Sequence, residues 1–187
     1  MVKNWRIRKD LSIEFCGHKL FRIECTQDFA KIKAGTLGGY IEKEENLDGE
    51  AWVYGSACVY GSARVYGSAC VCDSACVYGS ARVCDSACVY GEACVYGEAR
   101  VCDSACVCGD EIKNKDDICY ISNRCYDITI TPLHIKIGCQ YHAQEAWWNF
   151  TDEQIEQMDG ESALNFWRIW KEPLKQICEA MNKEQKQ

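Results

Sequence analysis

Small apolar residues recur at every sixth position through the middle of the chain. Between Gly49 and Cys108, Val occupies each sixth position from Val53 to Val107, and Ala stands two residues before each Val. Neither the period of a helix, about 3.6 residues, nor simple two-residue alternation produces a period of six, so each unit is predicted to be a short strand and a turn stacked on its neighbours. Ala and Val are predicted to face inward, because residues two positions apart in a strand share one face.

The residue between Ala and Val points outward and carries a second, longer period. Arg fills this position only at Arg64, Arg82 and Arg100, which are 18 residues apart. Three hexapeptides therefore return the chain to the same column, which predicts a triangular parallel β-helix of about four coils. One face would carry the three arginines. The other two faces would carry Cys58, Cys76 and Cys94 on one, and Trp52, Cys70, Cys88 and Cys106 on the other.

The pattern predicts a mainly β chain in three parts. Residues 1–36 are predicted to form a β-rich N-terminal cap, residues 37–110 the β-helix, and residues 111–187 a small α+β C-terminal region. A cap is expected because an open terminal coil would expose both its core and a row of unpaired backbone groups.

The edges of the repeat follow from counting in sixes. Counting back from Val53 places two aliphatic residues, Leu47 and Ile41, at inward positions, and before them an alternating segment predicts a hairpin around Gly17-His18. Counting forward places Lys113 at an inward position within a charged run, so the coils are predicted to end there.

The C-terminal region changes from a strand pattern to a helix pattern. Two β-rich segments are predicted either to continue the stack or to form a small sheet. Thr151 and Gln154 have the spacing of a capping box, and a longer amphipathic helix is predicted from about Glu161 to Met181. Pro173 is predicted to kink that helix or to start a new one.

Composition and charge narrow the function. The net charge of −7 argues against generic nucleic-acid binding, which needs a basic surface. The chain has no apolar run that could span a membrane and no apolar stretch typical of a signal peptide, so a cytoplasmic protein is expected. Most of the 16 Cys occupy repeat positions that also hold Tyr, Arg or Trp, which favours reduced thiols over a disulfide framework.

The lead-in "KAGTLGGYIEKEENLDGEAWVYG", the repeats and the later "HIKIGCQYH" resemble a group of phage and prophage hexapeptide-repeat proteins. The resemblance covers roughly the first three-fifths of the chain. It implies a left-handed β-helix in a bacterial host cell, an exception to the usual right-handed crossover. It also implies a non-enzymatic protein that binds a host protein, such as a component of an antiviral defence system, and inhibits it.

The alternative within the same architecture is a hexapeptide acyltransferase-like enzyme. As a family, those enzymes place a catalytic His beside the coils, whereas the three His of this chain, His18, His134 and His142, all lie outside residues 49–108. No catalytic residue and no cofactor are therefore predicted.

Two groups of residues have the types that bind metal. His134, Cys139 and His142 could ligate zinc, but a closed site needs a fourth ligand, and a structural role is the preferred interpretation. Cys84-Asp85 and Cys102-Asp103 would stack one coil apart as a soft-metal corner. Drift of the repeat explains that pair equally well, and no metal is predicted.

Three sets of residues are candidates for contacts. The arginine column is either a solvated stripe or a site for acidic side chains or a small phosphorylated ligand. The C-terminal region has four Trp residues that either fill its core or form a binding surface: Trp147, Trp148, Trp167 and Trp170. The two cysteine faces are apolar strips, so at least one is expected to be covered, by the C-terminal helices or by another copy in a dimer or trimer. Their thiols are expected to stay reduced.

Overall fold

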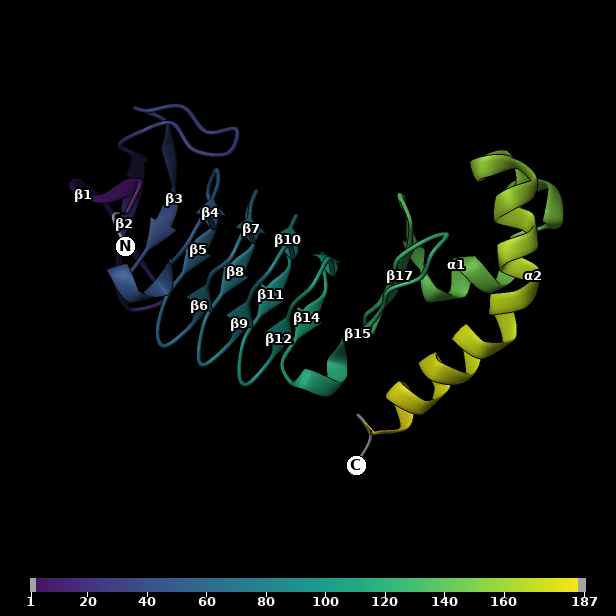
Figure 1. Ribbon diagram of the computed structural model, residues 1–187. Coiled ribbons are helices and arrows are strands. Elements are labelled where there is room, and N and C mark those ends of the chain that lie inside the picture. The colour runs from purple at the N-terminus through teal and green to yellow at the C-terminus, as the bar shows by residue number, and fades with distance from the viewer. Residues whose placement is uncertain (1–2, 185–187) are drawn as a thin grey trace. The chain divides into compact units, whose positions relative to one another are not determined.

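The protein was analysed as a computed structural model that describes residues 3–184. The chain divides into two compact units, Met1–Lys115 and Asp116–Gln187. The first unit is built from short strands and the second combines a sheet with helices (Figure 1).

The first unit contains fourteen strands and a short 3-10 helix, η1 (Glu44–Asn46). The strands are β1 (Trp5–Phe15), β2 (His18–Cys25), β3 (Leu37–Ile41), β4 (Trp52–Val53), β5 (Cys58–Val59), β6 (Arg64–Val65), β7 (Cys70–Val71), β8 (Cys76–Val77), β9 (Arg82–Val83), β10 (Cys88–Tyr90), β11 (Cys94–Val95), β12 (Arg100–Val101), β13 (Cys106–Cys108) and β14 (Glu111–Ile112).

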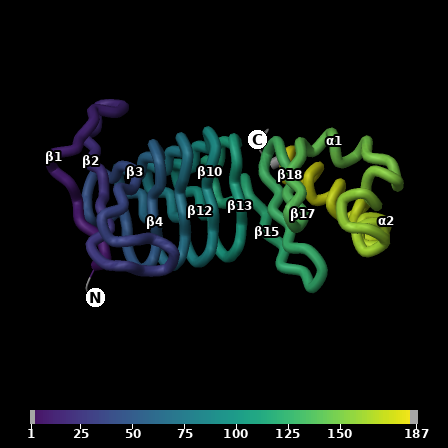
Figure 2. Tube along the Cα trace, turned by 90° about the horizontal axis from the view of Figure 1, so that it is seen from above, coloured from purple at the N-terminus to yellow at the C-terminus, as the bar shows by residue number. Residues whose placement is uncertain are grey.

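These strands form a parallel β-solenoid of about four turns. The chain visits three sheets in rotation, and the strands of one sheet are three elements apart in sequence: β3-β5-β8-β11-β14, β4-β7-β10-β13 and β6-β9-β12. Strands of adjacent coils pair in register, so that Arg64 lies opposite Arg82 and Val65 opposite Val83. Figure 2 shows the coils following one another between β4 and β13. The 18-residue period read from the sequence is thereby confirmed.

The core of the solenoid consists of the predicted Ala and Val columns. Every Val from Val53 to Val107 in the repeat is 0% exposed, and the Ala residues are at most 1% exposed. Backbone bonds hold each coil to the next, as between the Trp52 amide and the Ala69 carbonyl oxygen at 3.0 Å. A coil therefore contributes apolar contacts and a hydrogen-bond ladder to both neighbours, which is why a single coil would not be stable alone.

Corners of the coils use residues that accept a left-handed backbone. Gly67 has a φ of 74°, and a Cβ there would lie 2.9 Å from the Asp85 amide nitrogen of the next coil. Asp73 and Asp85 adopt the same region with φ values of 62° and 59°. Asp tolerates this region better than most residues. The Asp73 carboxylate in addition accepts a hydrogen bond from the Gly91 amide of the next coil at 3.1 Å, which ties the two corners together.

Both ends of the solenoid depart from the regular repeat. Ile41 and Leu47 are buried at inward positions, as predicted. At the other end β14 pairs with β11 and places Ile112, 0% exposed, opposite Val95. The expectation that Lys113 occupies the inward position was wrong, because the last corner is one residue shorter than the repeat and brings the aliphatic neighbour inward instead.

An antiparallel hairpin caps the first coil. β1 pairs with β2, and the turn uses Cys16 and Gly17, both with positive φ, which confirms the predicted hairpin. β2 pairs in turn with β3, so the hairpin extends one solenoid sheet. Leu20 and Ile23 are fully buried beneath it. The cap thereby satisfies the edge that the first coil would otherwise expose.

The second unit packs helices on an antiparallel sheet. A short 3-10 helix, η2 (Lys115–Asp117), spans the boundary of the two units. The sheet has the order β15 (Cys119–Ile121), β16 (Ile128–Ile130), β17 (His134–Ile137) and β18 (Gln140–Ala143), and the helices are α1 (Gln144–Asn149) and α2 (Asp152–Glu184). Of the two predicted alternatives, a separate small sheet is the one found.

The helix boundaries agree with the sequence except at the proline. Thr151 and Gln154 exchange the two hydrogen bonds of a capping box, at 3.0 and 3.3 Å. α2 is interrupted at Asp159 and Gly160, which have non-helical angles, and its long second part begins at Glu161 as predicted. Pro173 lies inside that second part, where no residue has non-helical angles. No new helix therefore starts at the proline, whereas a kink there stays a prediction, and the break in α2 is at the glycine, whose φ of 66° ends the first segment.

No helix in the described part of the chain has both the length and the apolar character required to cross a bilayer.

Substitutions at inward and outward positions of one coil are expected to differ sharply in their effect on stability. Val77→Asp would bury an unpaired carboxylate, whose desolvation costs several kcal/mol, so we expect no folded protein at 25 °C. Arg82→Ala removes an exposed side chain and should change the free energy of unfolding by less than about 0.5 kcal/mol. Thermal unfolding followed by circular dichroism measures both, and equal stabilities would contradict the inside-outside assignment.

Candidate functional site

The arginine column lies on the sheet β6-β9-β12, and all three side chains are exposed. Arg64 packs its guanidinium 5.8 Å from the centre of the Tyr66 ring and lines a cavity of about 430 Å³ with Glu44 and Asp48. Within residues 3–184, neither Arg82 nor Arg100 has a carboxylate within ion-pair distance. Arg82 and Arg100 are therefore positive charges without an ion-pair partner among the described residues, whereas Arg64 shares its cavity with acidic side chains.

Tyrosines form a ladder beside the first cysteine face. Tyr60, Tyr78 and Tyr96 stack with ring centroids 5.1 and 5.0 Å apart and nearly parallel planes. His18 of the cap lies 4.9 Å from the Tyr60 ring, and its Nδ1 is 3.0 Å from Glu42. The hydrogen bond with His18 lowers the pKa of the Glu42 carboxyl. His18 thus connects the cap to the first coil through Glu42 and Tyr60.

The first cysteine face contains one thiol with unusual acidity. Cys58 is buried, and Cys76 and Cys94 are half-buried in the same column. A hydrogen bond from Cys58 lowers the pKa of Cys76 to about 7, and the same contact together with burial raises the pKa of Cys58. Burial also raises the pKa of Cys94. Since the thiolate is the nucleophile, we expect Cys76 to be the more reactive member of this column at neutral pH.

Two pairs of stacked cysteines form disulfides, which corrects the expectation that the columns stay reduced. Cys70 bonds to Cys88 and Cys84 bonds to Cys102, each across 18 residues. Their Cα atoms are 4.9 and 4.7 Å apart, inside the ordinary range of about 4.4–6.8 Å. In-register strand pairing therefore brings two side chains of the same column close enough to bond, despite their parallel directions.

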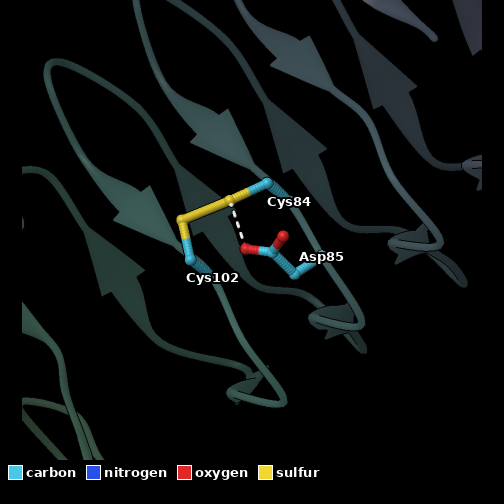
Figure 3. A group of neighbouring side chains, drawn as sticks. All are labelled: Cys84, Asp85 and Cys102. Atoms are coloured by element: carbon cyan, nitrogen blue, oxygen red, sulfur yellow. Dashed lines mark hydrogen bonds between the residues drawn. A yellow bond between two sulfur atoms is a disulfide. The ribbon is translucent and has the colours of Figure 1, made fainter. Parts of the chain in front are cut away.

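The Cys84 corner is drawn in Figure 3. The Asp85 carboxylate oxygen Oδ2 lies 3.1 Å from the Cys84 sulfur, which could donate a hydrogen bond to it only as a reduced thiol, and with Cys102 the three residues hold potential ligand atoms within 4.8 Å of one another. A metal needs thiolates, however, and both sulfur atoms are joined in the disulfide. The corner offers a soft-metal site only after reduction.

The other candidate metal ligands, His134, Cys139 and His142, are not brought together as one site. His134 pairs with Ala143 while His142 pairs with Ile135, so the two imidazoles leave opposite faces of the β17-β18 ladder. His134 stacks on Tyr141 with centroids 4.7 Å apart, and burial lowers the pKa of His142. Cys139 is exposed in the turn between the strands. The structural interpretation of these residues fits their positions.

The tryptophans of the second unit belong mainly to its core. Trp147 and Trp167 are 2% and 3% exposed, whereas Trp148 and Trp170 are half-buried against the same cluster. The Trp147 indole donates to the Ile135 carbonyl oxygen at 2.8 Å. Core packing thus accounts for two of the four tryptophans predicted as contact residues, and the others keep part of their surface exposed.

A cavity of about 180 Å³ lies within the second unit. Trp147, Trp167 and Phe166 form part of its apolar lining, and Tyr126 and Asp159 complete one side. The Tyr126 hydroxyl donates to the Asp159 carboxylate at 2.6 Å, and this bond raises the pKa of Tyr126 to about 12. Asp159 is one of the two residues that interrupt α2, so the break in the helix helps shape this cavity.

No protein-family model matches the chain, and comparison with curated proteins gives no significant match. The resemblance to phage hexapeptide-repeat proteins accordingly stays a hypothesis.

Sequence reasoning missed the two disulfides, the Cys76 thiol and the tyrosine ladder. The signal for all three was present in the 18-residue period, because any two identical residues in one column become neighbours across a strand pair. The arginine column was found by that signal, whereas the cavity of the second unit has no periodic signature.

We expect Cys76 to react with iodoacetamide with a half-maximal rate near pH 7, because the hydrogen bond from Cys58 stabilises its thiolate. Cys58→Ala removes the donor and should move the midpoint of Cys76 to higher pH. Alkylation rates at single cysteines, measured by mass spectrometry, test this. Cys94 serves as the control in the same column, and equal rates for Cys76 and Cys94 at pH 7 would contradict the assignment.

The core role of Trp167 predicts a large loss of stability on truncation. Trp167→Ala should destabilise the second unit by about 3–5 kcal/mol, because it removes a buried aromatic side chain. Trp148→Ala, at a half-buried position of the same cluster, should cost distinctly less. Denaturant unfolding followed by near-ultraviolet circular dichroism compares them, and a folded Trp167→Ala protein of unchanged stability would refute the core role.

Proposed function

We propose that this protein is a non-enzymatic binding module whose arginine column binds an acidic segment of a partner protein. The observation that supports this is the in-register stack of Arg64, Arg82 and Arg100 on one exposed sheet, with Arg82 and Arg100 lacking a carboxylate partner in the described residues. Like charges at strand spacing, roughly 4.7–4.9 Å, repel one another. An acidic partner would remove that repulsion.

The chemistry of the column favours carboxylates held along a line. Each guanidinium can form a bidentate pair with a carboxylate, and the rigid sheet sets the spacing of the three groups in advance. An exposed ion pair is worth only about 0.2–1 kcal/mol, so three pairs alone would give weak, salt-sensitive binding. A stable complex would therefore need further contacts. The second unit by itself offers a separate candidate contact, because its cavity lined by Trp147 and Trp167 could receive an apolar side chain.

A small anionic ligand is the second candidate for the same arginines. Phosphate would also form bidentate pairs with a guanidinium, and two neighbouring arginines would suffice. An acyltransferase-like enzyme is the third candidate, and it has less support, because His18 is engaged with Glu42 and Tyr60 in the cap.

The finer features of the architecture and the biological setting are part of the proposal. We propose a left-handed solenoid with a triangular cross-section, which three sheets visited in rotation would form. Phage or prophage origin, a cytoplasmic location in the bacterial host, and a host protein as the inhibited partner follow from the resemblance in sequence. Assembly into a dimer or trimer through a cysteine face is proposed because Cys76, Cys94 and Cys106 keep exposed surface.

Charge reversal in the middle of the column tests the acidic partner. We expect Arg82→Glu to weaken binding of a fluorescent glutamate-rich peptide about tenfold, equivalent to about 1.4 kcal/mol, and the wild-type affinity to fall as salt rises. Arg124→Glu makes the same change in net charge at an exposed position of the second unit and should leave binding unaltered. Fluorescence anisotropy measures the affinities.

The same titration separates the candidates. Competition by inorganic phosphate at concentrations near those of the peptide would favour the small anionic ligand. Equal weakening by Arg82→Glu and Arg124→Glu would show that only net charge matters, and would rule out the column as a site.

A further inference from the structure

The second cysteine face contains a disulfide and a thiol in one column. Cys70 on β7 and Cys88 on β10 are bonded, and Cys106 on β13 lies opposite Cys88 in the parallel register. Cys106 keeps its thiol. All three residues are half-buried.

The geometry of the column suits attack by the third sulfur. Cys88 has equivalent neighbours on both sides, since β7 and β13 pair with β10 in the same parallel register. The bonded pair has its Cα atoms 4.9 Å apart along the stacking direction, and the pairing of β10 with β13 repeats that stacking step. The strand register therefore places Cys106 beside Cys88 on the side opposite Cys70. Displacement at a disulfide sulfur needs this arrangement, with the entering and leaving sulfur atoms on opposite sides of the one attacked.

We propose that this column is a thiol-disulfide exchange site in which the bond moves between Cys70–Cys88 and Cys88–Cys106. The Cys106 thiol gives its proton to water, and its thiolate attacks the Cys88 sulfur. The Cys88–Cys106 bond forms as the Cys70–Cys88 bond breaks, and Cys70 leaves as a thiolate that takes a proton from water. One disulfide and one thiol are present before and after, so the step needs no external oxidant.

The two positions of the bond leave the remaining thiol in different surroundings. β13 is the edge strand of its sheet, so Cys106 is the outermost cysteine of the column. Cys70 lies next to Trp52, which is 1% exposed and closes the other end. With the bond at Cys70–Cys88 the thiol stands on the edge strand, where a low-molecular-weight disulfide of the glutathione class could react with it. With the bond at Cys88–Cys106 the remaining thiol lies beside the tryptophan.

The other disulfide provides a control within the same molecule. Cys84 and Cys102 form a column of only two cysteines, because the corresponding position one coil earlier is Tyr66 and the chain leaves the regular repeat after Cys108. No third thiol of that column can attack the bond. We therefore expect Cys84–Cys102 to stay in one position under conditions in which the other bond moves.

Mapping of the disulfides in the native protein tests the proposal. The full chain is incubated at pH 8, alkylated with iodoacetamide, quenched with acid and digested with pepsin at low pH, where exchange stops because thiolates are scarce. We expect tandem mass spectrometry to find both Cys70–Cys88 and Cys88–Cys106, in a ratio within about tenfold of one because the two bonds are chemically alike. Alkylated Cys70 should accumulate with time, and more slowly at pH 5.

Cys106→Ser supplies the matched variant, since it removes the attacking sulfur and keeps a residue of similar size. It should hold the bond at Cys70–Cys88 and leave Cys70 unlabelled. The proposal is overturned if Cys106 of the wild type is fully alkylated while Cys70 never is, if Cys106→Ser labels Cys70 as fast as the wild type does, or if the purified protein contains Cys70 and Cys88 only as thiols.

Discussion

The in-register stacking of small inward side chains is the constraint on which the first unit depends. Ala and Val fill the interior of every coil, and the backbone bonds between coils hold each of them directly beneath its counterpart. A residue of another size at one of these positions would open a void or force neighbouring coils apart, because protein interiors are close-packed. Gly and Asp at the corners serve the same constraint, since only a left-handed backbone turns the chain within so few residues.

The register that aligns the inward side chains of successive coils also aligns the outward side chains, and this explains which groups meet on the surface. The register that aligns Val65 with Val83 necessarily aligns Arg64 with Arg82, so a short repeat turns single side chains into ladders. The nature of the side chain decides the result. Tyrosines stack favourably with their rings parallel, and cysteines come close enough to form a disulfide. Arginines place like charges next to one another, and solvent or a bound anion must screen that repulsion. One geometric rule therefore produces an aromatic ladder, a thiol column and a basic stripe on one scaffold.

The core of the second unit is not built from a sequence repeat. Its core contains large aromatic and aliphatic side chains from an antiparallel sheet and two helices, among them Trp147 and Trp167, and no residue repeats at a fixed interval. Contacts between distant segments create its features, such as the bond from Tyr126 to Asp159 across 33 residues. The two units thus differ in what they present: the solenoid has rows of identical groups, and the second unit has an apolar cavity.

The sequence by itself determined everything that has a period or a local cause. The strand positions, the inward Ala and Val set, the three columns, the hairpin turn, the capping box at Thr151 and the helix from Glu161 all follow from spacing or from neighbours a few residues apart. Only the tertiary structure decided which residue occupies a position after a shift of one residue, and which residues far apart in the sequence come into contact. A corner one residue shorter moved Ile112 rather than Lys113 inward, and strand pairing brought Cys70 to Cys88 within bonding distance. The β17-β18 ladder sent His134 and His142 to opposite faces. A period states which residues share a column, but the distance and direction of their side chains depend on how the backbone packs.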